Sequence, residues 1–145
     1  MGILLSLSDN LSKGIIWNIT AIPTYNKSAQ ANNGTGITGY DIAVNTVGGL
    51  TADVYIKADG NLNTTGGDTI GLGNETFSYN TTNSSVPSKT KYKLSTELLD
   101  NKIGDNLPDG SYIYLKFFLT VPPGQAAGTY YNNVTIEAIP YGYSP

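Results

Sequence analysis

Alternation of apolar and polar residues with a period of two is the strongest structural signal in this chain. Within residues 111–121, apolar residues occupy every second position: Ile113, Leu115, Phe117, Leu119 and Val121. Successive side chains of a β-strand point to opposite faces, so this spacing places all of them on one face. The pattern predicts a strand with one buried face.

Similar, shorter patterns occur along much of the chain. They cover residues 15–21, 40–45, 52–57, 76–79, 91–96 and 134–138. Gly48 and Gly49 predict a hairpin turn between the second and third of these segments. Helical character is confined to one turn within 96–102, which Gly104 ends. We therefore predict an all-β, immunoglobulin-like or jelly-roll-like antiparallel sandwich of about seven or eight strands.

The length of 145 residues predicts a single domain, 1–145, with one hydrophobic core. Side chains on the inward phase of the expected strands should form this core: Trp17, Val54, Ile56, Leu115, Phe117, Leu119, Val134 and Ile136. Ile3, Leu5 and Leu7 alternate in the same way near the start of the sequence. Residues 1–14 are thus expected to supply either a first strand or a strand donated to a neighbouring subunit.

The composition argues against several classes of function. The chain has no Cys and no His, so the commonest zinc and copper ligands and every Ser-His-Asp or Cys-His arrangement are missing. A net charge of −3 with only eight basic residues provides no basic surface for binding nucleic acid. No apolar run approaches the roughly 20 residues of a membrane span. The carboxylates are scattered, so we expect neither an enzyme nor a cofactor.

Asn-x-Ser/Thr triplets are far more frequent than chance predicts. Of 15 Asn residues, chance would place about three in such triplets. Nine occur, at Asn10, Asn18, Asn26, Asn33, Asn63, Asn74, Asn80, Asn83 and Asn133. We expect N-linked glycans at the six that fall in turns or on outward strand positions: Asn18, Asn63, Asn74, Asn80, Asn83 and Asn133. The protein is then expected to be extracellular, on the cell surface.

The first seven residues lack the basic n-region and long apolar run of a signal peptide. We expect the sequence to begin after an export signal or to be cut from a longer precursor.

A weak calcium candidate lies in the turn-rich stretch after residue 58. Asp59, Asn61, Asn63 and Asp68 supply oxygen ligands at alternate or nearby positions. The spacing departs from an EF-hand at its sixth and twelfth positions, where Thr64 and Ile70 stand. A hydrogen-bonded hairpin turn is the favoured interpretation, and no metal is assigned.

Tyrosine is concentrated toward the end of the sequence. The cluster consists of Tyr112, Tyr114, Tyr130, Tyr131, Tyr141 and Tyr143. Tyrosine suits half-buried strands and subunit contacts, and it also forms platforms on which sugars stack. Packing and subunit contact are favoured over sugar binding.

Two stretches resemble a broad group of exported β-sandwich proteins. They are Val121-Pro-Pro-Gly-Gln-Ala-Ala-Gly-Thr-Tyr130, followed by Asn133-Val-Thr-Ile136, and Leu7-Ser-Asp-Asn-Leu-Ser-Lys-Gly-Ile15. The group includes archaeal threads, archaeal bundling pili and the bacterial biofilm fibre protein TasA. This resemblance implies an immunoglobulin-like sandwich whose copies polymerise when each donates an N-terminal strand to the next.

The sequence thus favours a structural subunit of a glycosylated extracellular filament, pilus or surface layer. Its expected partners are identical subunits and N-linked glycans. The main alternative is a secreted carbohydrate- or cell-binding module.

Overall fold

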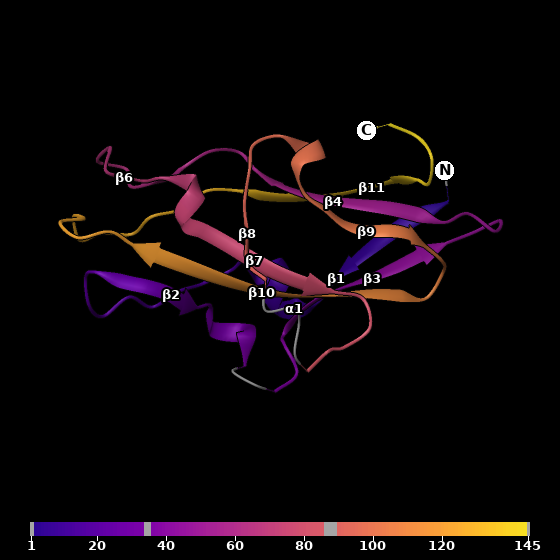
Figure 1. Ribbon diagram of the computed structural model, residues 1–145, viewed down its shortest axis with the longest axis horizontal. Helices are drawn as coiled ribbons and strands as arrows, with labels where there is room; N and C mark the ends of the chain where they lie inside the picture. The colour runs from indigo at the N-terminus through magenta and orange to yellow at the C-terminus, as the bar shows by residue number, and fades with distance from the viewer. Residues whose placement is uncertain (1, 34–35, 86–89, 145) are drawn as a thin grey trace.

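Two antiparallel sheets packed face to face form a β-sandwich, which confirms the predicted fold class (Figure 1). The computed structural model describes residues 2–33, 36–85 and 90–144. The strands are β1 (Ile3–Leu7), β2 (Thr24–Ser28), β3 (Tyr40–Thr46), β4 (Ala52–Ala58), β5 (Leu62–Asn63), β6 (Thr69–Ile70), β7 (Glu75–Asn80), β8 (Tyr92–Lys93), β9 (Lys102–Leu107), β10 (Ser111–Val121) and β11 (Val134–Pro140). The helical elements are α1 (Asp9–Lys13), η1 (Gln30–Asn32), η2 (Leu72–Asn74) and η3 (Leu98–Asp100). Within these described ranges, eight strands have at least five residues.

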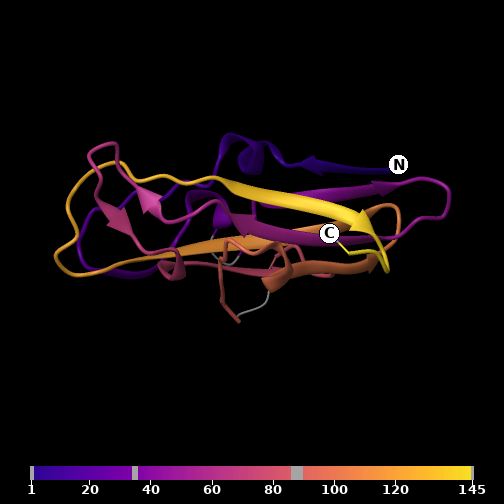
Figure 2. The same cartoon turned by 90° about the horizontal axis from the view of Figure 1, so that it is seen from above.

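Strand β10 organises the larger sheet, which we call sheet A. The order in sheet A is β1-β3-β10-β7-β8, and β2 pairs with the end of β10 that β3 does not reach. The smaller sheet, sheet B, has the order β11-β4-β9. Strands β5 and β6 form a separate hairpin. Seen from above, β1 (indigo) and β11 (yellow) lie at the same edge of the sandwich (Figure 2).

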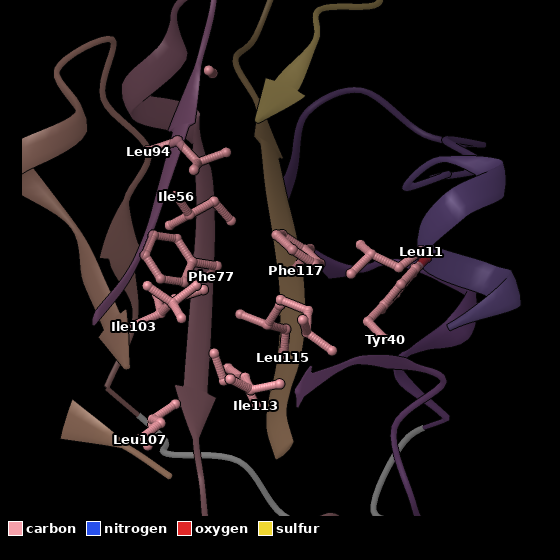
Figure 3. Packing of buried hydrophobic residues seen from close by; sticks show 14 of the residues in the cluster. Leu11, Tyr40, Ile56, Phe77, Leu94, Ile103, Leu107, Ile113, Leu115 and Phe117 are labelled. Carbon is pink, nitrogen blue, oxygen red and sulfur yellow. The ribbon is translucent and has the colours of Figure 1, made fainter. Parts of the chain in front are cut away.

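The core lies between the two sheets and follows the predicted phase of β10 (Figure 3). Phe117 is fully buried and meets the Tyr40 ring edge-on, with 5.4 Å between the ring centroids. The other predicted core residues of β4 and β10 are also buried: Val54, Ile56, Leu115 and Leu119. Trp17, Val134 and Ile136 are half-buried at the edge. The alternation therefore identified the core face correctly.

The predicted hairpin between 40–45 and 52–57 is wrong. Both segments are strands, and Gly48 and Gly49 adopt φ values of +68° and +76° in the turn. However, β3 belongs to sheet A and β4 to sheet B, so the turn carries the chain across the sandwich. Alternation identifies a buried face, but two strands on opposite sheets bury their faces in the same core equally well.

The segment 15–21 is not a strand, although its side chains alternate as predicted as far as Ile19; Ala21, which the alternation places on the same face, is exposed. Ile15, Trp17 and Ile19 are half-buried, whereas Ile16 and Asn18 are exposed. The segment forms no ladder with either sheet, and the carbonyl of Ile16 instead accepts a hydrogen bond from the Gln30 N–H at 2.8 Å. This extended segment therefore covers the core without closing the sheet.

The helical turn predicted within 96–102 is present as η3, a short 3₁₀ helix. Its prediction as the one helical segment is wrong, because α1, η1 and η2 are helical too.

Candidate functional site: an apolar groove at the open edge of the sandwich

Three edge strands of the sandwich are protected against pairing with other chains. Strand β8 has two residues, one of them Lys93. Register shifts interrupt the pairing of β2 and of β9, and each strand contains an Asn with positive φ: Asn26 in β2 and Asn106 in β9. Short length, lysine and irregular backbone are the devices that blunt sheet edges.

Strand β1 lacks these devices. It pairs in regular antiparallel register with β3, from Ile3 opposite Thr46 to Leu7 opposite Ile42. Ile3 and Leu5 pack against the core, as predicted for the inward face. Leu7, the third predicted residue of that face, is 42% exposed at the end of the strand, and Leu4 on the other face is 64% exposed. An unguarded, apolar edge strand of this kind is prone to pair with other chains.

Strand β11 is the second edge without a lysine or a register shift, and Pro140 protects only its last position. It pairs with β4 over seven consecutive residues without a register shift. The Asp59 N–H donates to the Asn133 carbonyl, and the Tyr141 N–H donates to the Thr51 carbonyl. The backbone groups of odd-numbered residues in β11 therefore form the hydrogen bonds to β4. Backbone N–H and C=O groups of successive residues point to opposite sides of a strand, so those of Val134, Ile136 and Ala138 point away from β4.

A groove with a volume of about 1010 Å³ lies along this edge. One wall runs from β1 through α1 to residue 22, and the other is formed by residues 125–136. Apolar side chains dominate its lining and include Leu5, Leu7, Leu11, Ile15, Trp17, Ile19, Leu62, Ile70, Leu119, Val121, Val134 and Ile136. The Trp17 indole is fixed there by donating Nε1–H to the Lys27 carbonyl at 3.0 Å.

One carboxylate is buried in this groove. Glu75 begins β7 and is 1% exposed, with Oε1 accepting a hydrogen bond from Asn132 Nδ2 at 2.8 Å. Asn132 also donates to the carbonyl of Gly60 at 3.0 Å. Burial raises the pKa of Glu75 to about 6; the Asn132 hydrogen bond opposes this shift, and the negative charge of Asp59 adds to it.

Sequence reasoning missed Glu75. The alternation along residues 75–79 could have placed it in the core, because Glu75 shares the inward phase with Phe77 and Tyr79.

The side-chain oxygens of three weak calcium candidates, Asp59, Asn61 and Asn63, accept hydrogen bonds from the protein. Both oxygens of Asp59 accept from Asn133, one from its backbone N–H at 2.9 Å and one from its Nδ2 at 3.0 Å, and these bonds lower the pKa of Asp59. Asn61 Oδ1 accepts from the Leu72 N–H, and Asn63 Oδ1 accepts from Thr69 Oγ1. The Asp68 carbonyl accepts from the Thr64 N–H. No group of three acidic side chains suited to a metal ion occurs in the described parts of the chain.

The six predicted glycosylation sites differ in accessibility. Asn18, Asn63, Asn83 and Asn133 are exposed, whereas Asn74 and Asn80 are half-buried. Asn83 Oδ1 accepts from the Ser85 N–H, and Asn80 Oδ1 accepts from the Thr82 and Asn83 N–H groups, so these two side chains are ordered within their turn. Exposure permits modification at the first four sites.

The clustered tyrosines divide into three groups. Tyr112 and Tyr114 project from the outer face of sheet A and stack on each other, with ring centroids 6.0 Å apart and planes inclined by 14°. Tyr130 instead donates its hydroxyl to the Ala126 carbonyl beside the groove. Tyr131, Tyr141 and Tyr143 are each more than half exposed.

No protein-family model matches the chain, and the search of curated proteins found no significant match. Within the described residues, no helix is long and apolar enough to cross a membrane.

Proposed function

We propose that this protein is a structural subunit of a glycosylated extracellular filament, pilus or surface layer, assembled by exchange of β1 between neighbouring copies. The observation that carries the proposal is the geometry of β1. It is an apolar, unguarded edge strand that one ladder with β3 attaches to the sandwich. Such a strand can detach from its own sandwich and pair with β3 of an identical neighbour, because it makes the same contacts there.

The surroundings of β1 support this exchange. Ser8 follows β1 and caps the short helix α1, because its Oγ accepts a hydrogen bond from the Leu11 N–H. The groove borders Leu5 and Leu7, so apolar core surface already lies open beside the strand. Withdrawal of β1 would enlarge this surface, and a neighbour's Ile3 and Leu5 would cover it again. Exchange therefore exposes little additional surface in the assembled state.

The dense sequons support the extracellular part of the proposal. Exposed Asn side chains on several turns can carry N-linked glycans, which would supply the solubility that so few charged residues do not.

Cysteine pairing tests the exchange directly, because the chain contains no other cysteine. Ser6 and Ala43 lie opposite each other on the outer face of β1 and β3. In the double variant Ser6→Cys, Ala43→Cys, cross-linking of assembled material with a short bis-thiol reagent should give a ladder of covalent oligomers on denaturing gels. Each single variant is the matched control and should give no species beyond a dimer. Exclusive formation of cross-linked monomer from assembled material would contradict β1 exchange.

The stacked tyrosines favour a second candidate, a carbohydrate- or cell-binding module. Aromatic rings on an exposed sheet face suit contact with sugar rings, and Asp41 lies opposite Tyr114 to accept hydroxyl hydrogen bonds. Binding of the unassembled protein to insoluble polysaccharide, lost on Tyr112→Ala and retained on Tyr131→Ala, would favour this candidate.

A further inference from the structure

The outer edge of β11 offers a row of backbone groups to a further strand. Val134, Ile136 and Ala138 direct their N–H and C=O groups away from β4, and no other described strand pairs with them. Their side chains pack toward the core, so the edge and the apolar groove form one continuous surface. An extended peptide could pair with the backbone and insert alternate side chains into the groove.

The chemistry of the groove specifies one of those side chains. The Glu75 carboxylate lines the groove and has Asn132 as its hydrogen-bond partner; the described residues place no cation in an ion pair with it. Asn132 precedes β11 by two positions, which places the carboxylate near the start of the open edge. A buried carboxylate with a single neutral partner is poorly compensated, and an ammonium group would be complementary to it.

The surrounding titratable groups do not supply that ammonium. They are Asp59 in the turn after β4, Lys13 at the end of α1, Lys93 on β8, and Tyr130 and Tyr131 before β11. Lys13 and Lys93 are exposed, and neither forms an ion pair with Glu75.

We propose that the β11 edge and groove bind an extended segment of a partner protein in which a lysine stands between apolar residues. The segment adds a strand to sheet B, its apolar side chains fill the groove, and its ammonium pairs with the Glu75 carboxylate. The exchanged strand, Ile-Leu-Leu-Ser-Leu at residues 3–7, carries no cation. This interface is therefore distinct from β1 exchange and goes beyond the proposed function.

Matched peptides test the proposal on the full chain. The probe is an acetylated nonapeptide in which Val and Thr alternate and the central Val is replaced by Lys; its control carries norleucine at that position. At pH 7.5, fluorescence anisotropy should show about tenfold tighter binding of the Lys peptide. The preference should disappear in Glu75→Gln and persist in Glu137→Gln, which removes an exposed carboxylate of β11. N-methylation of alternate peptide amides should abolish binding.

A pH titration of the wild-type protein covers the case in which Glu75→Gln does not fold. The Lys preference should decline as the pH falls through about 6, where Glu75 becomes protonated. Equal or tighter binding of the norleucine peptide, a preference that survives in folded Glu75→Gln, or no binding of either peptide would overturn the proposal. The cysteine test of β1 exchange does not involve this groove contact, so the two ideas can fail separately.

Discussion

The side-chain amide of Asn32 pairs with the backbone of Phe117 across 85 positions of sequence. Asn32 Nδ2 donates to the Phe117 carbonyl at 2.8 Å, and the Phe117 N–H donates to Asn32 Oδ1 at 3.0 Å. Along this edge, β10 pairs with β3 up to Leu115 and with β2 from Phe118 onward. Asn32 therefore takes the place of a strand where β10 changes partners.

Removal of this amide should be costly. Asn32 is 1% exposed, so Asn32→Ala should leave the buried Phe117 N–H without its partner, whereas the Phe117 carbonyl keeps the bond from the Ala29 N–H, and should lower the free energy of unfolding by about 2 kcal/mol. Urea denaturation monitored by Trp17 fluorescence measures the change. Asn45→Ala, on the exposed face of β3, is the control and should stay within about 0.5 kcal/mol of wild type. A loss below about 1 kcal/mol for Asn32→Ala would show that water replaces the amide.

Adjacent phenylalanines on β10 test the phase of the strand. Phe117 is fully buried, and Phe117→Ala should cost about 3–5 kcal/mol through loss of contacts and cavity formation. Phe118 points to the outer face, where Lys91 Nζ lies 4.6 Å from its ring centroid, and Phe118→Ala should cost about 1 kcal/mol. The same denaturation experiment compares the two, and a larger loss for Phe118→Ala is incompatible with the register of β10.

The sequence predicted strand faces better than strand neighbours. Alternation depends on local geometry, so it identified the buried phase of β4 and β10 and even the half-buried side chains of the unpaired segment 15–21. Pairing depends on distant residues, which explains why β3 and β4 were wrongly expected to form a hairpin. Strand β2 went unpredicted because its side chains are mostly exposed and do not alternate.

The site was predicted only in part. Ile3 and Leu5 were identified by alternation, but Leu7 is partly exposed because β1 ends there. The partnership of Glu75 with Asn132 joins residues 57 positions apart and has no local signature. The role of Asn32 is equally non-local, since an Asn in a polar stretch looks like any other turn residue.

Glu75 should make the protein more stable in mild acid than at neutral pH. The pKa of Glu75 is raised from 4.5 to about 6 in the folded state, so protonation of Glu75 favours folding. This contribution to stability is fully present below pH 4.5 and is lost as the pH rises through 6. The difference corresponds to about 2 kcal/mol. Urea unfolding at pH 4.5–7.5 measures it, and Glu75→Gln should flatten the profile in this window. A wild-type profile that rises across the same window would contradict the assignment.

Glycans are expected first at the exposed sequons. Native material should exceed the 15.4 kDa of the bare chain, and peptide mapping should find modification at Asn18, Asn63, Asn83 and Asn133 more often than at half-buried Asn74 and Asn80. Enzymatic or chemical deglycosylation should return the polypeptide mass, which serves as the control. Native protein with the bare polypeptide mass would remove the main argument for an exported glycoprotein.

Deletion of residues 1–7 tests whether β1 is an exchangeable part of the fold. Among the described residues, those that are almost completely buried in the core begin at Leu11, so the remainder of the sandwich keeps its central packing without β1. The deleted protein should therefore remain a folded, soluble monomer that no longer assembles, while the full chain does. A synthetic peptide of residues 1–7 should bind to it, because the β3 edge and the space vacated by Ile3 and Leu5 are open together. Circular dichroism, analytical ultracentrifugation and peptide titration measure the three properties. If the deleted protein unfolds or aggregates and the peptide does not restore it, β1 is an obligatory strand of its own sheet and the exchange is disproved.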